Sequence, residues 1–386
     1  MNKAIKHLIT DKTSCFKVSK MIIESCYIQG LDIKGITQLM FCYAEPSLVK
    51  STIESAPENT ISIWLFYYFY NFPTDCIDRE NLNDLYQFFE SEKNWGSSRT
   101  SYISLDFLSK YETIDSEVFV KVARLILAKK EHSPASVVSY FFLLLSSITY
   151  STKEVIAKFT SDHQLLEELY LFVCNHDDGV DSEGALLSEL CTLRKDFARK
   201  YAEIVLRNKP SSSLYEPART QSLFDCPGYI GIIDTMVDAY LCSPSTYFVH
   251  APILHSLIFV SEDRVIKSDE WIQHYISAND SNEEKMWLLF NEIAELPDKR
   301  KLKHIHYFIS QNENPEAFKR IPLLPSSSSW SGSAIPMYSG RIEYLKSLIP
   351  FLSGIRYLEH KKRVNDEIEA VQKMIESEEI EDLLRG

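Results

Sequence analysis

Glycine is scarce in this sequence, with 11 residues among 386. Tightly turned all-β folds and phosphate-binding loops both rely on glycine, because it adopts left-handed backbone conformations at little cost. No Gly-Lys dipeptide and no Gly-x-Gly-x-x-Gly pattern occurs, so P-loop and dinucleotide-binding motifs are missing. The sequence also contains no Gly-x-Ser-x-Gly motif and no His-Glu dipeptide, which excludes the nucleophile elbow and the zincin helix.

Paired cysteines are also missing, since no Cys-x-x-Cys spacing occurs among the eight cysteines. In so long a chain, scattered cysteines predict reduced and mostly buried thiols, as in a cytoplasmic protein. The eight positions are Cys15, Cys26, Cys42, Cys76, Cys174, Cys191, Cys226 and Cys242.

Long apolar runs are too short to span a membrane. The two longest, Ile61–Phe72 and Val137–Tyr150, fall short of the roughly 20 residues that a bilayer requires. The N-terminus has charged residues where a signal peptide would have its apolar segment, so no leader is expected. Both runs predict core helices, and the sequence predicts no membrane partner.

The net charge is −13, and an acidic surface repels nucleic-acid phosphates. Broad coating of DNA or RNA is therefore disfavoured, although a local basic patch remains an option. The chain is 45% apolar and 25% charged, as in an ordinary globular protein with a buried core. Aromatic residues are abundant, with 21 tyrosines, 21 phenylalanines and 5 tryptophans.

Apolar residues recur at steps of three and four, which is the helical period. Val118, Val122, Leu125 and Ile126 form one such stripe. Between residues 60 and 176 this pattern predicts about six helices of roughly 12–16 residues, joined by short polar turns. Short turns force neighbouring helices to run antiparallel, so serial hairpins of roughly 35–45 residues are expected to stack.

Helix starts carry their own signals. Ser151, Ser161 and Ser281 are each followed three residues later by Glu or Gln, which predicts three capping boxes. The predicted fold class is all-α: an irregular α-solenoid or elongated helical bundle with a C-terminal helical pair. We expect residues 1–215 to form an N-terminal helical-repeat region and 216–325 a second one. Residues 326–386 are then a Ser/Pro linker and amphipathic helices.

The C-terminal region holds the candidate partner-binding residues. Four apolar side chains step by four, three and four in the last helix, which is a brief heptad pattern. Such a stripe either packs on a neighbouring helix or docks a partner or a second copy. An exposed tryptophan in a linker is a further candidate anchor. The candidates are Trp330, Tyr338, Val364, Ile368, Val371 and Ile375.

A basic segment precedes the linker. It is either a phosphate- or acid-binding patch or a solvated helix face, and a charge run is usually the latter. His304 and His306 are two residues apart, so on a helix they point in different directions and do not share a metal ion. The sequence predicts no metal and no cofactor. The patch consists of Lys299, Arg300, Lys301, Lys303 and His304.

One weak arrangement would suit a metal-dependent nuclease or hydrolase. Asp263 lies about twenty residues before Glu283 and Lys285, and two carboxylates with a lysine can hold Mg²⁺ beside a phosphate. The capping signal at Ser281 places Glu283 in the first turn of a helix. Acidic residues are electrostatically favoured at that position. The nuclease thus remains an alternative without a catalytic motif.

The segments Trp330–Pro336 and Arg341–Lys346, together with the helical body, resemble the helical-repeat arms of bacterial STAND-type anti-phage defence proteins. The resemblance lies in the general helical character of the chain, not in a diagnostic motif, so no functional residue is carried over. Because this chain has no nucleotide-binding loop, the resemblance implies a separate subunit or an arm alone. We therefore expect a non-enzymatic protein-binding scaffold, or a sensor or accessory subunit of a larger complex. The alternatives are the nuclease and a nucleic-acid-binding accessory protein.

Overall fold

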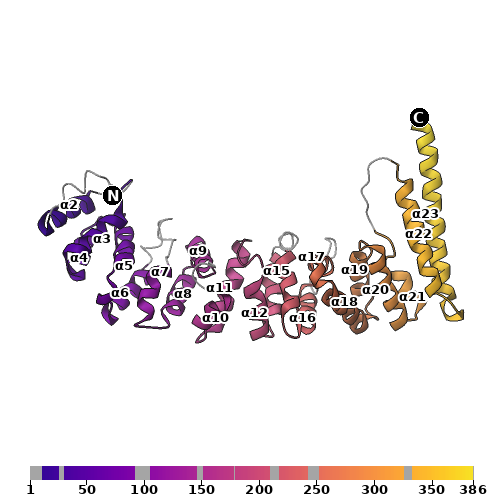
Figure 1. Ribbon diagram of the computed structural model, residues 1–386, viewed down its shortest axis with the longest axis horizontal. Coiled ribbons are helices and arrows are strands. Elements are labelled where there is room, and N and C mark those ends of the chain that lie inside the picture. Colours follow the sequence, from indigo (N-terminus) through magenta and orange to yellow (C-terminus); the bar gives the residue numbers. More distant parts are fainter. Residues whose placement is uncertain are drawn as a thin grey trace. The chain divides into compact units, whose positions relative to one another are not determined.

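The computed structural model describes residues 11–25, 30–91, 105–145, 151–177, 179–208, 217–241, 252–325 and 333–385. The chain is 78% helical, with 21 α-helices and no strand among these residues (Figure 1). The all-α prediction is therefore confirmed. The chain forms two compact units, Met1–Asp181 and Ser182–Gly386.

The first unit has short helices throughout its described part. Seven of them lie between residues 60 and 176, and their lengths run from 7 to 14 residues. The structure thus has one helix more than the about six expected there, and most of the seven are shorter than the expected length of roughly 12–16 residues. The helices are α2 (Lys12–Glu24), α3 (Ile33–Tyr43), α4 (Pro46–Ile53), α5 (Ile61–Asn71), α6 (Arg79–Glu90), α7 (Leu105–Glu112), α8 (Val118–Ala128), α9 (Pro134–Leu144), α10 (Thr152–Lys158) and α11 (His163–His176).

The second unit ends in its longest helix. A π-helical segment (Ala202–Leu206) continues α13, and short 3₁₀ segments lie at Ser222–Asp225, Glu262–Arg264, Ile349–Phe351 and Ile355–Tyr357. The α-helices are α12 (Ala185–Leu193), α13 (Phe197–Tyr201), α15 (Pro217–Gln221), α16 (Tyr229–Leu241), α17 (Pro252–Ile258), α18 (Val265–Asn279), α19 (Glu283–Ile293), α20 (Asp298–Gln311), α21 (Pro315–Arg320), α22 (Ile335–Leu348) and α23 (Leu358–Arg385).

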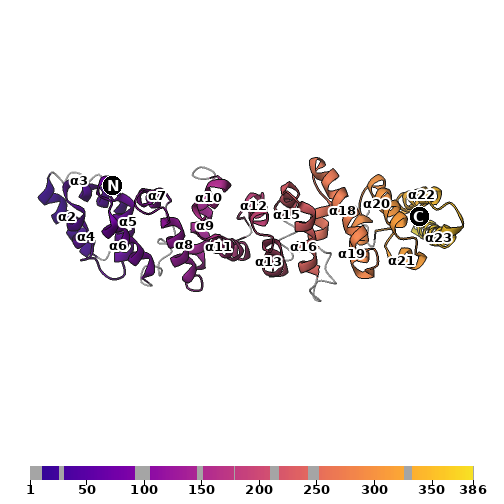
Figure 2. The same cartoon turned by 90° about the horizontal axis from the view of Figure 1, so that it is seen from below.

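Within the second unit, from α15 onward, each helix packs on the helix whose label is two higher. Helices α16, α18, α20 and α22 contact one another in that order and form one layer. Helices α15, α17, α19, α21 and α23 form the other layer in the same way (Figures 1 and 2). In the first unit, α3 packs on α5, α5 on α7, and α6 on α8. This two-layer stacking of hairpins is the arrangement of an α-solenoid.

Polar contacts between stacked hairpins show the length of the repeat. In the first unit, Lys50 reaches Asp84 at 2.6 Å across 34 positions. In the second, Trp271 donates to Asp234 at 3.0 Å across 37 positions, and Gln221 donates to the Phe259 carbonyl across 38. These spacings agree with the expected unit of roughly 35–45 residues.

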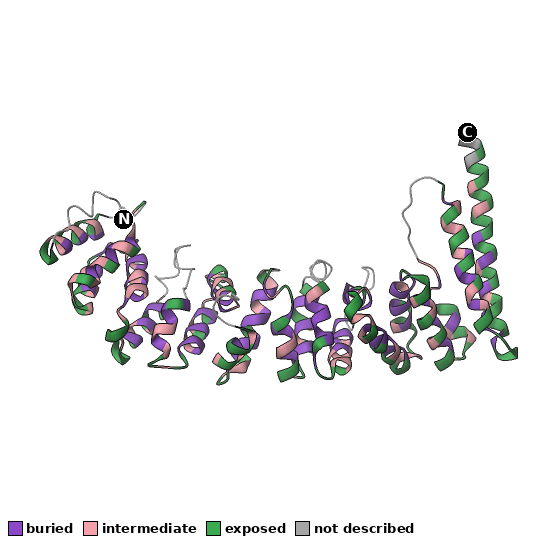
Figure 3. Cartoon of the chain, viewed as in Figure 1, coloured by how far each residue is buried: buried purple, intermediate pink, exposed green. Residues whose placement is uncertain are grey.

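The helix sides that face one another are mostly buried and the outer sides are mostly exposed (Figure 3), and most of the buried residues are apolar. The aromatic run at 61–72 forms α5, as predicted, and Trp64 on it is fully buried. Of the cysteines that the structure describes, Cys15, Cys174, Cys191 and Cys226 are buried, and none is in a disulfide. Among the described helices, none is long and apolar enough to cross a membrane.

The observed N-caps show how accurately the sequence signals predict where a helix starts. The capping box at Ser151 is confirmed, since its hydroxyl accepts from the Glu154 amide. At the next two sites the prediction was wrong by one residue, because Asp162 and Asn282 are the caps. Asp and Asn cap at least as well as Ser. Asp162 is in addition held by Arg124 at 2.6 Å, so a tertiary contact favours the later start.

Part of the predicted Ser/Pro linker is helical, as is part of a second stretch, residues 208–228, which contains several prolines and serines. Pro336 lies in the first turn of α22, where proline is tolerated because its missing N–H needs no partner. Ser222, in the second stretch, is buried and donates to the Gly184 carbonyl at 2.8 Å. Gly184 has φ of 73°, and a Cβ there would lie 2.4 Å from that hydroxyl, so the contact requires glycine. The three-part division at 215 and 325 stays a prediction beside the two compact units.

Candidate protein-docking surface

Most of the basic segment is used inside the fold. Arg300 donates to Asp269 at 2.7 Å, Lys303 reaches the same carboxylate at 2.9 Å, and His304 contacts it at 3.0 Å. Arg300 also donates to the carbonyl of Ile258 at 2.7 Å. These contacts join α18 to α20, so the charges stabilise the stacking of two hairpins.

Burial and pairing set the protonation of this cluster. Burial by itself would raise the pKa of Asp269, but hydrogen bonds from His304, Lys303 and Arg300 outweigh it and hold the pKa well below its usual range. Burial lowers the pKa of His304, and its contact with Asp269 only partly offsets this. His304 is fully buried and its Nδ1 has no partner, so its ring is inaccessible to a ligand.

Lys301 is also occupied. Its ammonium is buried, donates to the Ala294 carbonyl at 3.0 Å and lies 4.2 Å from the centre of the Tyr344 ring. Burial lowers its pKa, and Asp298 at 3.4 Å acts in the opposite direction. Lys299 and Lys303 are the exposed members of the predicted patch, and Lys303 pairs with Asp269. The segment therefore leaves little free positive charge for a phosphate.

The nuclease candidates are paired as well. Lys285 reaches Asp238 at 2.6 Å and Asn279 at 3.0 Å, while Glu283 forms an ion pair with Arg320. Glu283 does lie in the first turn of α19, where its charge suits the helix dipole. Within the described part of the chain, no group of three acidic, histidine or cysteine side chains is placed to hold a metal ion.

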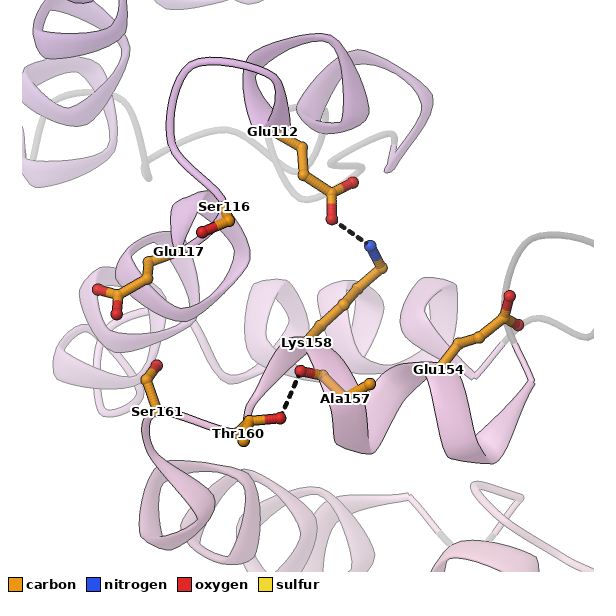
Figure 4. Close-up of a pocket in the computed structure, with 8 residues that line it drawn as sticks. All are labelled: Glu112, Ser116, Glu117, Glu154, Ala157, Lys158, Thr160 and Ser161. Atoms are coloured by element: carbon orange, nitrogen blue, oxygen red, sulfur yellow. Dashed lines mark hydrogen bonds and ion pairs between the residues drawn. The ribbon is translucent and has the colours of Figure 1, made fainter.

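A hollow of about 390 Å³ lies in the first unit, where the end of α7 faces α10 (Figure 4). Three glutamates line it, and Lys158 pairs with one of them, Glu112, at 2.7 Å. Lys158 also lies 4.4 Å from the centre of the buried Phe119 ring. Thr160 donates to the carbonyl of Ala157 at 2.6 Å. The lysine is thus held by the fold, and the hollow presents carboxylates and hydroxyl groups.

The predicted C-terminal stripe turns inward. Val364, Ile368 and Val371 are buried, and Ile375 is half-buried. Helix α23 carries them against α22 and α21. Helices α22 and α23 run antiparallel, since the Ala334 amide at the start of α22 donates to Glu378 near the end of α23 at 3.4 Å.

The last two candidates lie at or before the start of α22. Tyr338 is half-buried on α22, with the Arg341 guanidinium 6.0 Å from its ring centre. Trp330 lies outside the described residues. Neither placement tests a role in partner binding.

A different side of α23 is free. Leu358, Ile380 and Leu383 are 59%, 59% and 81% exposed. At about 100° per residue they fall within an arc of about 60°, roughly 120° away from the buried stripe. The same arc holds exposed polar residues. We call this surface the free face of α23: Leu358, Lys362, Asn365, Glu369, Glu376, Ile380 and Leu383.

The free face reaches the end of the hairpin. The start of α22 lies beside Glu378, so the last turns of α23 extend beyond it (Figure 1). Sequence reasoning missed this surface because it followed the more regular heptad pattern at Val364–Ile375. The available signal was the spacing of Leu358, Ile380 and Leu383, which share one helical face.

Comparisons with known proteins add no further assignment. No family model, no curated protein and no solved structure matches this chain.

Proposed function

We propose that this protein is a non-enzymatic protein-binding scaffold, an accessory subunit of a larger complex, and that the free face of α23 is its docking surface. The observation that carries the proposal is the placement of Leu358, Ile380 and Leu383 in water on one side of a long helix. Exposed apolar side chains that recur on one side of a helix are typical of helices that dock on a partner.

The buried stripe supports this proposal, because it holds α23 in place without help from the free face. Val364, Ile368 and Val371 bury against the neighbouring helices and hold α23 in place. The apolar residues of the free face contribute little to that packing, since they are exposed. A stack of hairpins also offers long exposed surfaces, which solenoid proteins use for binding partners.

The two alternative functions find less support. A nuclease would need Lys285 free to polarise a phosphate, but Asp238 and Asn279 hold it. Nucleic-acid binding would need free cations on α20, but Asp269 takes up Arg300 and Lys303. The resemblance to sensor arms directs the search for the partner to cytoplasmic anti-phage defence complexes.

The test uses the full-length chain as bait in its native host, followed by reconstitution with the purified partner. Ile380→Asp on the free face should weaken the reconstituted complex at least about tenfold, because a charge replaces an apolar contact. Met374→Asp is the matched control. Met374 is 47% exposed on the same helix but lies outside the free face, so affinity should be unchanged.

Circular dichroism would check that both variants fold. The proposal fails if no stoichiometric partner is recovered, or if the two substitutions weaken the complex equally.

A further inference from the structure

The charges of α23 are distributed against its own helix dipole. The first turns carry Lys361 and Lys362 beside one acid, Glu359, and the last turns carry Glu376 and Glu379. Cations favour the C-terminal end of a helix and anions the N-terminal end, so this order does not stabilise the isolated helix. It does suit an antiparallel neighbour that carries the same sequence, because basic turns then face acidic turns.

The free face has a mirror order about Glu369. Lys362 and Glu376 lie seven positions on either side of it, and Leu358 and Ile380 lie eleven positions on either side. Ile355, which is 87% exposed just before α23, and Leu383 lie fourteen positions on either side. Reversal of the helix therefore places a cation opposite an anion and apolar residues opposite apolar residues.

We propose that the partner on the free face is a second copy of this chain, with the two α23 helices antiparallel about a two-fold axis at Glu369. This inference rests on the proposed function and names the partner. In such an isologous contact every pair occurs twice. Lys362 of each copy faces Glu376 of the other, and Leu358 faces Ile380.

The charged residues are available for this contact. Lys362 and Glu376 are exposed, and neither forms an ion pair or hydrogen bond with another described residue. The arrangement has one cost, since Glu369 meets its own copy at the axis. Lys373 offsets it in part, because it pairs with Glu369 of the same helix at 3.1 Å.

The expected dimer is weak and reversible. Helix α23 has 28 residues and is about 42 Å long, so pairing along it buries on the order of 1,000 Å², the lower limit for specific interfaces. The centre of the stripe is polar, and apolar contacts form only towards its two ends. A polar centre fixes register and orientation at some loss of affinity.

Charge reversal in the full-length chain tests the pairing, with sedimentation equilibrium as the measurement. Lys362→Glu and Glu376→Lys should each raise the dimer dissociation constant about tenfold or more, because two attractive contacts become repulsive. The double variant restores both pairs and should return to within about threefold of the wild type. Its control is Glu316→Lys with Lys319→Glu, which inverts an exposed ion pair on α21.

A second substitution is expected to act in the opposite direction. Glu369→Gln removes the repulsion at the axis and should tighten the dimer about threefold or more. A variant that merely damaged the helix would not do so. A dimer that stays unchanged or weakens would overturn the two-fold position.

Self-association is overturned if the wild-type chain is monomeric at every concentration. It is also overturned if the double variant dimerises no more tightly than the single variants. Both results leave the docking proposal standing if a different protein binds the wild type and loses affinity with Ile380→Asp. The dimer is supported only if both single variants weaken dimerisation and the double variant restores it.

Discussion

Two helix contacts in the second unit are built from different chemistry. The contact between α18 and α20 is organised by charge, because Asp269 accepts from Arg300, Lys303 and His304. The contact of α23 with its neighbours is mainly apolar, although Arg363 donates to the Ile321 carbonyl at 2.6 Å, and the histidine buried there, His360, has no partner at either ring nitrogen. Hydrogen-bonded charges dominate the first contact, and apolar packing dominates the second.

The difference bears on function. Paired charges at α18 and α20 fix the position of one hairpin on the next, because Asp269 on α18 binds three side chains of α20 at once. The apolar contact at α23 needs only one stripe of the helix. The rest of α23 remains exposed and can carry a docking surface. The four predictions that follow test this contrast, beginning with the largest effect.

Removal of the central carboxylate should have the largest effect. Asp269→Ala leaves Arg300 and Lys303 without their common acceptor, and we expect a loss of about 3–5 kcal/mol in the free energy of unfolding. Urea denaturation of the full-length chain measures it. Asp298→Ala is the control, since Asp298 is exposed and pairs with Lys301 at 3.4 Å; its cost should stay below about 1 kcal/mol. Similar costs for the two variants would contradict the role of the cluster.

Truncation of an apolar side chain to alanine should have different effects on the two sides of α23. Val364→Ala removes two methyl groups from a fully buried site and should cost about 2 kcal/mol. Ile380→Ala on the free face should change the unfolding free energy by less than about 0.5 kcal/mol. Dimer dissociation should show the reverse order, with Ile380→Ala having the greater effect. A large loss of stability at Ile380 would mean that the free face is needed for folding.

Substitution of the two buried histidines should have different effects on stability in the same urea denaturation assay. His304→Phe loses the hydrogen bond to Asp269 and should destabilise the fold by about 1.5 kcal/mol. His360→Phe removes two unpartnered ring nitrogens beside Phe318 and Tyr357, so it should be neutral or stabilising at pH 7. Equal losses in both variants would argue against the contrast between the two contacts.

Acidification should give a smaller effect. Burial lowers the pKa of His304 and, with the nearby Arg363 charge, that of His360. The unfolded chain then binds more protons, so stability falls as the pH drops below about 6.5. We therefore expect a lower free energy of unfolding at pH 5.5 than at pH 7, measured by urea denaturation. His360→Phe should flatten the dependence, and a wild-type chain equally stable at pH 7 and 5.5 would contradict it.

Local sequence signals predicted the type of structure well. Apolar residues at steps of three and four gave the helices, and the Ser151 signal gave its cap. The same kind of signal placed two other caps one residue early, because Asp162 and Asn282 were equally suitable and a contact with Arg124 favours the later position. Local propensity leaves such choices open when neighbouring residues cap equally well.

The candidate site was harder to predict. The run of charges at Lys299–Lys303 looks like a surface patch, but its acceptor, Asp269, lies more than thirty positions earlier. The heptad stripe at Val364–Ile375 satisfied the pattern for a docking helix and was nevertheless used against neighbouring helices. A pattern shows that a side of a helix is apolar and does not show what covers it.

The sequence by itself determined that this chain is helical and that its hairpins repeat at about the length observed, because periodicity and helix ends are properties of neighbouring residues. Only the tertiary structure decided which charges are paired, which histidines lack partners, and which side of α23 stays in water. Those outcomes depend on residues from successive hairpins, and sequence spacing alone does not specify which of them meet.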